Sequence, residues 1–382
     1  MRILHLCLGN FFIDNYSYQE NMLTKYHVMM GHEVTVIASL FSFGADGIET
    51  TLPGPSEYNN VDGVHVIRLA YKRPVKLYKF LRRFVGLREA IERIEPEIIF
   101  SHNVSYSDTT VVVDYLKHHP HVQLFADNHA DYVNSAKNWL SKYILHPIIW
   151  RHYAKLLEPY LLRCYGVTPM RCRFLKEMYK IQPGLIEFLP MGVDDEAIPL
   201  DRDAVRADIR SELGICANDI VVFTGGKIDR LKNTHILINA IEKMNNSHLH
   251  LIICGTLTPE MSQLKYQIEN NSRIHYLGWC SAKKIINCMV AADFACFPGT
   301  HSTLWEQAIG LGLPAIYKRW FEMEHVNVND NCLLIKGEDE NGLIVALTRF
   351  LDTDFRSVIT QKAVIASNSF LYSQIAYKAI NS

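Results

Sequence analysis

Two segments in the second half of the chain carry residue types that suit the binding of a phosphate. The first, TGGKIDRLKN, follows a buried strand and places Lys227, Arg230 and Lys232 just after two glycines. Glycines let a backbone approach a ligand closely, and cations beside a helix start stabilise an anion. A diphosphate site is one interpretation. A turn with solvated cations is the other, because the segment is neither a Walker loop nor a clean GxGxxG.

The second segment, FPGTHSTLWEQAIGLGLP, runs from a strand that ends at Phe297 into a loop, residues 299–303, and then into a helix. Free amide groups at such a helix start suit an anionic or hydroxyl-rich ligand. Glu306 lies in the first turn of this helix. It is either a ligand for a sugar diol or a carboxylate that the helix dipole favours for structural reasons.

Short apolar runs along the whole chain predict the strands that would position these segments. They are residues 3–8, 34–38, 64–69, 97–100, 122–126, 186–189, 220–224, 249–254, 274–276, 294–297, 314–317 and 332–335. Neither side of these runs is polar, which is typical of strands buried on both faces. Segments with helical spacing lie between them, so the sequence predicts parallel sheets with right-handed crossovers.

The alternation of strand and helix restarts after a polar stretch over residues 190–219, where IVVFTGG opens a new strand and turn. We therefore expect an α/β fold with two Rossmann-like, doubly wound domains that face a cleft, and a boundary near 190–200. Ligands of such sheets bind outside the carboxyl ends of the strands, so the residues just after each strand matter most.

Composition narrows the class of protein. The chain has 382 residues, with 39 Lys and Arg against 40 Asp and Glu, a balance that argues against a general nucleic-acid binder. Nine cysteines stand singly, as expected for free thiols in a reducing compartment. The first apolar run is too short for a signal peptide, and no run reaches the roughly 18 residues of a membrane span. These features predict a cytoplasmic protein, either soluble or associated with the inner face of the cell membrane.

In their order and spacing, several segments resemble one family. MRILHLCLGN with GHEVTVIAS, then PMGVDDE, GGKIDRLKN, HYLGW and WEQAIGLGLPAI are similar to the motifs of retaining glycosyltransferases with the GT-B fold. The resemblance covers nearly the whole chain and is to family 4, a group that builds bacterial polysaccharides and glycolipids.

The resemblance implies a different role for each of the two domains. Residues 1–190 would form an acceptor-side domain, onto which a C-terminal helix, about 365–382, packs back. Residues 191–364 would bind the nucleotide sugar. The donor would be a UDP- or GDP-sugar and the acceptor a saccharide or a lipid-linked saccharide. No metal, cofactor or nucleic acid is expected.

The resemblance also implies roles for residues. Lys227 and Lys232 would neutralise the donor diphosphate, and Glu306 would bind the ribose hydroxyls. His129, in FADNHAD, would act near the donor sugar, with a structural histidine as the alternative, and Glu20 would lie on the acceptor side. The other donor-binding positions are Gly9, Asn10, Gly226, Arg230, Gly255, Trp279, Gly299, Thr300, His301, Ser302 and Thr303.

One position departs from the family pattern. The family usually has an earlier glutamate in the loop before Glu306 that helps to hold the donor sugar, and this chain has Pro298 there. His301 or the loop amides would have to replace it. Two alternatives therefore remain: a catalytically impaired protein that binds nucleotide sugars, and a sugar-nucleotide 2-epimerase, which shares the two-domain architecture.

Two DxD matches, 201–203 and 352–354, lie in polar stretches beside helices and are interpreted as surface residues. No set of Cys and His has zinc-site spacing, so no metal site is expected. Residues 71–93 hold eight Lys and Arg, with apolar residues at helical spacing. This pattern predicts a basic amphipathic helix that either contacts anionic lipid or turns its apolar side to the core.

Overall fold

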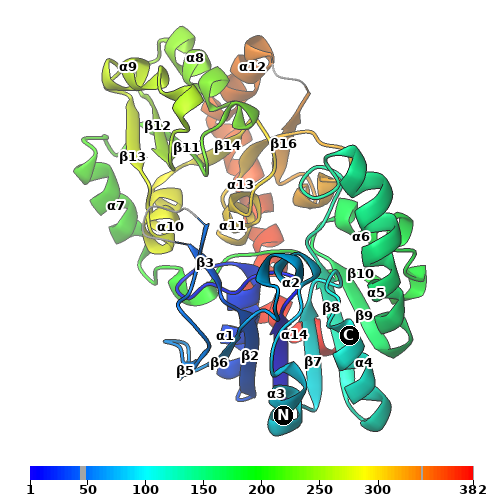
Figure 1. Cartoon of the computed structure of the whole chain (residues 1–382). Helices are drawn as coiled ribbons and strands as arrows, with labels where there is room; N and C mark the ends of the chain where they lie inside the picture. Colours follow the sequence, from blue (N-terminus) through cyan, green and yellow to red (C-terminus); the bar gives the residue numbers. More distant parts are fainter. Residues whose placement is uncertain (44–48, 337–338, 382) are drawn as a thin grey trace. The chain divides into compact units, whose positions relative to one another are not determined.

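The computed structural model describes residues 1–43, 49–336 and 339–381. The chain divides into two compact units. The first unit contains Met1–Pro190 together with Ile375–Ser382, and the second contains Met191–Gln374. Each unit is built on its own sheet, flanked by helices (Figure 1).

The sheet of the first unit has the strand order β10-β9-β8-β7-β1-β2-β6-β5. Its strands are β1 (Arg2–Cys7), β2 (Glu33–Ser39), β5 (Ser56–Asn59), β6 (His65–Leu69), β7 (Ile98–His102), β8 (Gln123–Asn128), β9 (Leu161–Gly166) and β10 (Ile186–Phe188). All neighbouring pairs are parallel except β5 with β6. A separate two-stranded sheet pairs β3 (Phe41–Phe43) with β4 (Glu49–Thr51) in the antiparallel sense.

Helices cover both faces of this sheet. They are α1 (Gln19–Met29), α2 (Val75–Leu81), α3 (Leu87–Ile94), α4 (Thr109–His118), the π-helix η1 (Ser141–Trp150), α5 (Arg151–Leu157), α6 (Pro169–Glu177) and α14 (Tyr372–Asn381), with short 3-10 turns η2 (Glu158–Tyr160) and η3 (Pro183–Leu185). Side chains alternate along a strand, so Leu4 and Leu6 join the core under α3 to α6. His5 lies on the opposite face, where its ring meets that of His27 in α1.

The second unit has a fully parallel sheet in the order β13-β12-β11-β14-β15-β16. Its strands are β11 (Ile220–Gly225), β12 (Leu249–Cys254), β13 (Ile274–Gly278), β14 (Phe294–Phe297), β15 (Ala315–Lys318) and β16 (Cys332–Ile335). Its helices are α7 (Arg202–Glu212), α8 (Thr234–Met244), α9 (Leu264–Glu269), α10 (Ala282–Ala291), α11 (Leu304–Gly310), α12 (Glu340–Leu351) and α13 (Thr353–Ser367). Short 3-10 turns are η4 (Asp195–Ala197), η5 (Arg230–Lys232), η6 (Pro259–Met261), η7 (Glu324–Val326) and η8 (Asn368–Phe370).

Two apolar clusters, one on each face of this second sheet, form the core. One packs α7, α10 and α11 against the sheet, and the other packs α8, α9 and α12. The expected fold class, α/β with two Rossmann-like domains, is confirmed. All twelve predicted strands are present, each within one or two residues of its expected bounds.

The single helix expected over residues 71–93 is wrong. The segment forms two helices, α2 and α3, and the chain turns between them through Arg82 and Gly86, which have φ angles of 56° and 77°. Only the second helix turns its apolar residues inward, since Leu87 is buried whereas Leu77 and Phe80 of α2 are exposed. The two DxD segments lie at helix starts on the surface. Asp201 and Asp352 are exposed, and their side chains cap α7 and α13.

Burial of α14 in the first unit gives a test of the fold. Ala376 is fully buried, whereas its neighbour Tyr377 is 60% exposed. We expect Ala376→Glu to lower the free energy of unfolding by about 3–5 kcal/mol, because it forces an unpaired carboxylate into the core. Urea denaturation measures the change. Tyr377→Glu is the matched control and is expected to have little effect. Equal behaviour of the two variants would contradict the packing of α14.

Candidate active site

Glu306 lies at the centre of a buried polar cluster in the second unit. Its side chain is fully buried in α11, just beyond the carboxyl end of β14. Its Oε1 accepts hydrogen bonds from Nε2 of His301 at 2.7 Å and from Nε2 of His325 at 2.8 Å. A carboxylate is only an acceptor, so both imidazoles carry their proton on Nε2.

The two histidines decide the ionisation of this carboxyl group. Burial alone would raise its pKa, but the charges and hydrogen bonds of His301 and His325 lower the pKa of Glu306 to about 2. Its second oxygen, Oε2, is buried and has no hydrogen-bond partner in the described part of the chain. A buried carboxylate oxygen left without a donor is costly, so a ligand hydroxyl would improve the site.

Lys232 ties the turn after β11 to the loop before Glu306. Its Nζ donates to the carbonyl oxygens of Thr300 and His301, both at 2.8 Å. The two segments touch at Gly299, where an added Cβ would lie 2.2 Å from the carbonyl carbon of Lys232. Only glycine fits there. An ammonium group has three donors, so one remains for an anion after these two bonds.

Burial also affects the charge of this lysine. Because its ammonium group is largely removed from water, the pKa of Lys232 is lowered to about 8. Below that pH it is a fixed cation, close to the loop that holds His301. Lys232 follows β11 and Glu306 follows β14. These two strands are parallel neighbours, so the cation and the carboxylate lie at the same edge of the sheet.

The other predicted donor-binding residues are placed less uniformly. Lys227 and Arg230 are exposed, and Arg230 lines a separate hollow of about 250 Å³ together with Glu260. Trp279 is 77% exposed.

Gly226 and Gly255 adjoin one another so closely that a Cβ on Gly255 would lie 1.8 Å from the oxygen of Gly226. Thr300, Ser302 and Thr303 are half-buried in the loop. Their roles stay predictions.

Pro298 stands where the family pattern has its first glutamate, and its backbone carbonyl is bonded to a side chain of the neighbouring turn. Its carbonyl accepts a hydrogen bond from Nδ2 of Asn233 at 3.0 Å. The Nε2 atom of His301, proposed as a substitute, is directed at Glu306. Sugar recognition by this loop would therefore fall to its backbone groups and to the remaining polar side chains.

The first unit has its own buried carboxylate, Asp127, at the end of β8. Its Oδ1 accepts from the amide of Asn103 at 2.9 Å, and its Oδ2 bonds to Nδ1 of His102 at 2.8 Å. His129, the predicted catalytic histidine, has its Nε2 3.3 Å from the same Oδ2 and 3.7 Å from Oε1 of Glu20. The structure thus brings the predicted residues His129 and Glu20 together.

The charges of Asp127 and Glu20 outweigh the Arg171 charge and raise the pKa of His129, against the effect of burial. The pKa of Asp127 is held far below its usual range by His129 and His102 in spite of its burial. Asn10 joins this group, because its amide donates to Glu20. Gly9 adjoins it as well: an added Cβ there would lie 2.9 Å from the Cβ of Asn103.

A line of buried histidines extends from Asp127 to α14. Nε2 of His102 lies 3.0 Å from Nδ1 of His5, and Nε2 of His5 lies 3.0 Å from Nδ1 of His27. Nε2 of His27 lies 2.9 Å from the carbonyl oxygen of Ala376 in α14. His5, His102 and His27 are all fully buried. We call these three residues the histidine relay.

Two sets of three side chains place potential metal-ligand atoms, one from each residue, within 4.8 Å of one another. They are Glu20 with His102 and His129, and Glu306 with His301 and His325. In the first set both ring nitrogens of His102 already make hydrogen bonds. In the second set the two Nε2 atoms donate to Glu306 itself. A cation would have to displace these bonds.

Sequence reasoning did not find Asp127, His325 or the histidine relay. A signal for part of the relay is present in the sequence, because His5 interrupts an otherwise apolar strand, and a polar residue in such a strand needs a buried partner. Asp127 lies two residues before His129, at the end of the same run. For His325, in η7, no sequence pattern marks its role.

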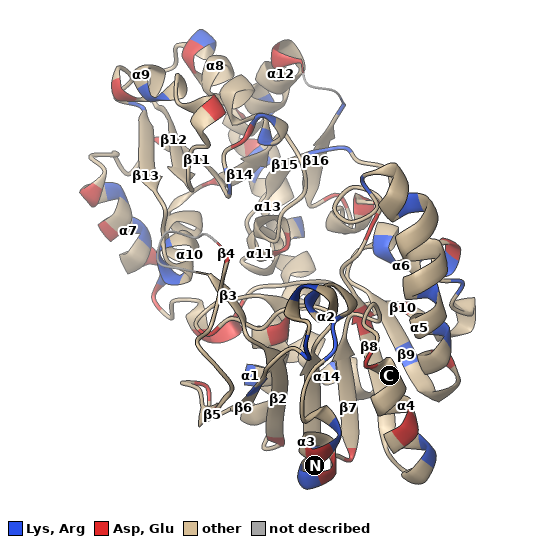
Figure 2. Cartoon of the chain, viewed as in Figure 1, with Lys and Arg blue, Asp and Glu red and all other residues tan. Residues whose placement is uncertain are grey.

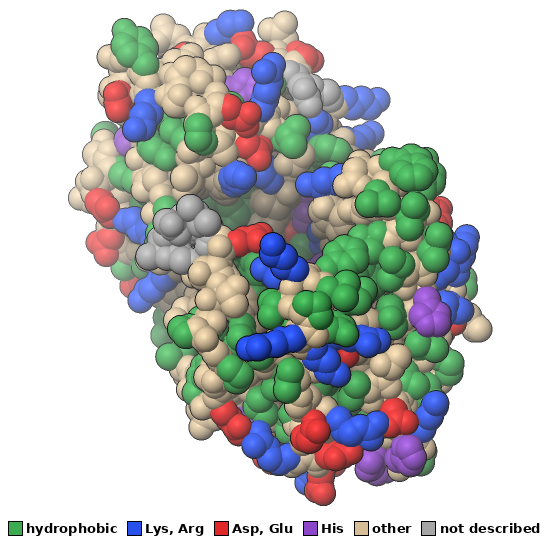
Figure 3. Space-filling model, viewed as in Figure 1, with side chains coloured by type: hydrophobic (Ala, Val, Ile, Leu, Met, Phe, Trp, Pro, Cys, Tyr) green, Lys and Arg blue, Asp and Glu red, His purple; other side chains and the backbone are tan. Residues whose placement is uncertain are grey.

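The α2 segment presents a mixed surface on the first unit. Basic residues cluster on and around it in Figure 2, and green and blue side chains lie side by side over it in Figure 3. Phe80 of α2 contacts the ring of Trp150, where η1 ends. Arg82 turns inward instead, and its Nη1 donates to the carbonyl oxygens of Gly9 at 2.5 Å and Ser105 at 2.6 Å. Among the described residues, no helix is long and apolar enough to cross a bilayer.

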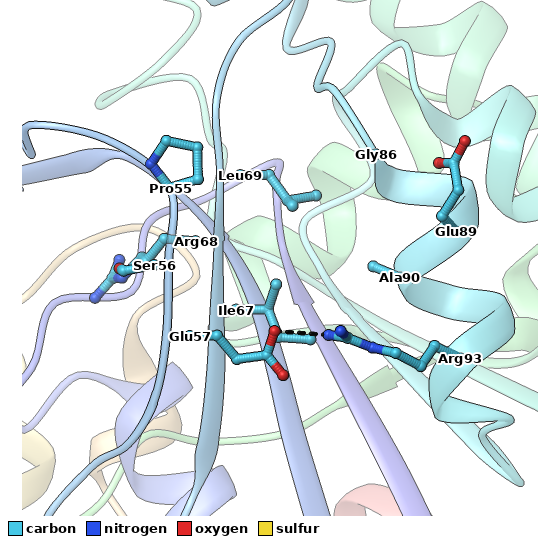
Figure 4. A pocket seen from close by; sticks show the side chains of 10 residues that line it. All are labelled: Pro55, Ser56, Glu57, Ile67, Arg68, Leu69, Gly86, Glu89, Ala90 and Arg93. Atoms are coloured by element: carbon cyan, nitrogen blue, oxygen red, sulfur yellow. Dashed lines mark hydrogen bonds and ion pairs between the residues drawn. The ribbon is translucent and has the colours of Figure 1, made fainter.

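A pocket of about 500 Å³ lies elsewhere in the first unit, between β5, β6 and α3 (Figure 4). Glu57 and Arg93 point toward one another across it and pair at 2.8 Å. None of the predicted site residues lines this pocket, so it is separate from the clusters around Glu306 and Asp127.

Comparisons with known proteins agree with this architecture. A sequence model described as "Glycosyltransferase Family 4" matches residues 21–197, and one described as "Glycosyl transferases group 1" matches residues 218–353. Together they account for most of both units. The chain belongs to the GT-B glycosyltransferases of the family 4-like type. Among curated proteins, none matches it in sequence.

Solved structures share the fold across the full length. Sucrose-phosphate synthase from Thermosynechococcus elongatus has 16% identity and a TM-score of 0.68, covering 99% of this chain and 97% of that one. HepE of Anabaena in complex with UDP has 16% identity and a TM-score of 0.68, covering 99% and 98%. WaaG, a glycosyltransferase involved in lipopolysaccharide biosynthesis, has 14% identity and a TM-score of 0.65 and covers 100% of both chains.

The buried position of Lys232 predicts a pH dependence of anion binding. With a pKa of about 8, the side chain is about nine-tenths cationic at pH 7 and about nine-tenths neutral at pH 9. If Lys232 binds the diphosphate, the affinity for UDP or GDP should fall about tenfold as the pH rises across this range. Isothermal titration calorimetry measures it.

Lys232→Arg is the control for this titration, because a guanidinium keeps its charge up to pH 9. The variant should lose the pH dependence while it retains binding. A wild-type affinity that stays constant from pH 7 to pH 9 would contradict contact between Lys232 and the diphosphate.

Proposed function

We propose that this glycosyltransferase is a retaining enzyme that moves a sugar from a UDP- or GDP-sugar to a saccharide or lipid-linked saccharide, in polysaccharide or glycoconjugate synthesis, without a metal. One observation carries the donor part: the ionised carboxylate of Glu306 is buried with a free oxygen, Oε2. Two adjacent ribose hydroxyls would supply the donors that this oxygen lacks. HepE was solved with UDP, which makes UDP the first nucleotide to test.

The second unit would hold the nucleotide diphosphate. As the bond from the sugar to the diphosphate breaks, negative charge grows on the leaving phosphate and positive charge on the sugar. A fixed cation beside the phosphate stabilises this state without reorganisation. Lys232, which the carbonyl oxygens of Thr300 and His301 hold in place, would supply that cation. Lys227 and Arg230, which are exposed near the same turn, would add positive charge beside the diphosphate.

The first unit would handle the sugar and the acceptor. In this proposal His129 contacts the donor sugar, and Glu20 with Asn10 borders the acceptor. Positioning of the acceptor hydroxyl against the anomeric carbon supplies much of the rate. The leaving phosphate takes the acceptor proton, so no carboxylate nucleophile is needed. This differs from retaining glycoside hydrolases, which use two carboxyl groups.

The donor site is tested with purified protein and a panel of UDP, GDP and their common sugar conjugates, first by thermal shift and then by calorimetry. Glu306→Gln should weaken binding of the preferred nucleotide by roughly 10- to 100-fold, as expected for a lost charge-assisted bond of about 1.5–3 kcal/mol. Glu324→Gln, at an exposed glutamate of η7, is the matched control. Equal affinity in both variants would contradict the ribose assignment.

Turnover is measured by product analysis with the preferred sugar nucleotide, with and without acceptor and with EDTA present. A transferase requires the acceptor, an epimerase changes the sugar nucleotide without one, and an impaired protein binds without turnover. We expect acceptor-dependent transfer that survives EDTA. Lys232→Ala should lower the rate about 100-fold, because loss of one preorganised charge partner costs about 3 kcal/mol.

A lipid-linked acceptor would bring the enzyme to a membrane, and we assign the contact to the α2 surface. Lys76, Lys79 and Phe80 are exposed there. Lys76→Gln with Lys79→Gln should weaken binding to anionic liposomes roughly thirtyfold, at about 1 kcal/mol per charge. Lys265→Gln with Lys283→Gln, two exposed lysines of the second unit, is the control. Wild-type protein that does not bind anionic liposomes would refute the contact.

A further inference from the structure

We propose that the histidine relay holds one proton more than three neutral imidazoles carry, and that this proton locks the Asp127 carboxylate in position against His129. The relay joins β7, β1, α1 and α14, elements that are distant in sequence. The inference rests on the proposed function only for the use it gives His129. The proton itself can be counted in the free protein.

Counting hydrogens gives the extra proton. The line from Asp127 through His102, His5 and His27 to the carbonyl of Ala376 contains four close contacts, of 2.8, 3.0, 3.0 and 2.9 Å. Each hydrogen bond needs one hydrogen. The carbonyl oxygen and the carboxylate at the ends can only accept, and three neutral imidazoles bring only three N–H groups. One further proton is required to complete all four bonds.

The alternative location for this proton is Asp127 itself. Its environment favours the carboxylate, because Oδ1 accepts the Asn103 amide and Oδ2 also lies 3.3 Å from Nε2 of His129. The extra proton then belongs to the rings. Attraction to the carboxylate places it on His102, the ring in direct contact with Asp127.

The direction of every bond follows from that placement. His102 donates from Nδ1 to Asp127 and from Nε2 to His5. His5 donates from Nε2 to His27, and His27 donates from Nε2 to Ala376. Burial lowers the pKa of His5, and of His27 to about 4, which agrees with neutral rings at these two positions.

The consequence for His129 is positional. A doubly protonated His102 neutralises Asp127 inside the core, so the carboxylate remains ionised and keeps Oδ2 bonded to His102 and 3.3 Å from Nε2 of His129. Oε1 of Glu20, 3.7 Å away, is the second carboxylate oxygen near this nitrogen. His102, His5 and His27 are therefore positioning residues that act on His129 through Asp127. The other titratable or charged groups that face the relay, Asp127 or His129 are Glu20, Arg171, His32, Cys7 and Cys164.

The second unit provides an internal comparison. Nδ1 of His250 lies 3.1 Å from Nε2 of His275, and Nε2 of His250 lies 3.4 Å from Oδ2 of Asp219. These two contacts need two hydrogens, and two neutral imidazoles supply one N–H each, so no extra proton is needed. The same counting rule therefore predicts two neutral rings at His250 and His275 and one charged ring in the relay.

The test is ¹⁵N NMR of the full chain with labelled histidine at pH 8, with signals assigned by single substitutions. We expect His102 to show the imidazolium signature and His5, His27, His250 and His275 to show neutral Nε2–H tautomers. His5→Phe removes the acceptor for His102 Nε2, so His102 should become neutral. Three neutral relay histidines in the wild type would overturn the proposal, whether or not transfer activity is found.

A second variant separates positioning from folding. The glutamine of His27→Gln keeps an acceptor for His5 and a donor for Ala376. We therefore expect His102 to stay charged in this variant. That result would show that the hydrogen bonds, and not the packing of the rings, hold the extra proton. In the transfer assay, His5→Phe should lower kcat roughly tenfold or more with KM little changed and should alter the pH profile of kcat. An unchanged profile in a folded His5→Phe protein would overturn the positioning role.

Discussion

The pairing of buried carboxylates with imidazoles is the constraint on which both candidate sites depend. Asp127 in the first unit and Glu306 in the second are each fully removed from water at the carboxyl end of a parallel sheet. An isolated carboxylate would be protonated in such a place, because burial penalises its charge. Two histidines keep each one ionised: His102 and His129 for Asp127, and His301 and His325 for Glu306.

The two carboxylates differ in what they leave open. Both oxygens of Asp127 are in contact with donors from the protein, so its role is internal: it positions a neighbour. Glu306 has one oxygen satisfied twice and the other not at all. A carboxylate held by histidines thus positions a neighbouring side chain in the first unit and is proposed to bind a ligand in the second. The two uses differ in whether both carboxylate oxygens already have donors from the protein.

Much of the fold was predictable from sequence, because strands of a parallel sheet are apolar on both faces and stand out as short continuous runs. Strand β9 was missed because LLRCYG carries an arginine, and the single helix over 71–93 was wrong because helical spacing alone does not reveal a break at Arg82. Within the candidate site, Glu306 and Lys232 were found from loop patterns. Asp127 and the relay were not, since their partners come from β1, β7, α1 and α14, and no local spacing encodes such contacts. The roles of these residues stay predictions.

Chain connectivity has a consequence for biosynthesis. The first unit is discontinuous, since Ile375–Ser382 completes it after the whole second unit has been made. On the ribosome, some 180 further residues are synthesised after β10 before Ala376 can contact His27 and Ala379 can enter the core. During that delay the apolar face that α14 later covers is exposed, as in other nascent chains with late contacts. A fragment that ends at the first unit's boundary, near residue 190, would remain permanently in that incomplete condition.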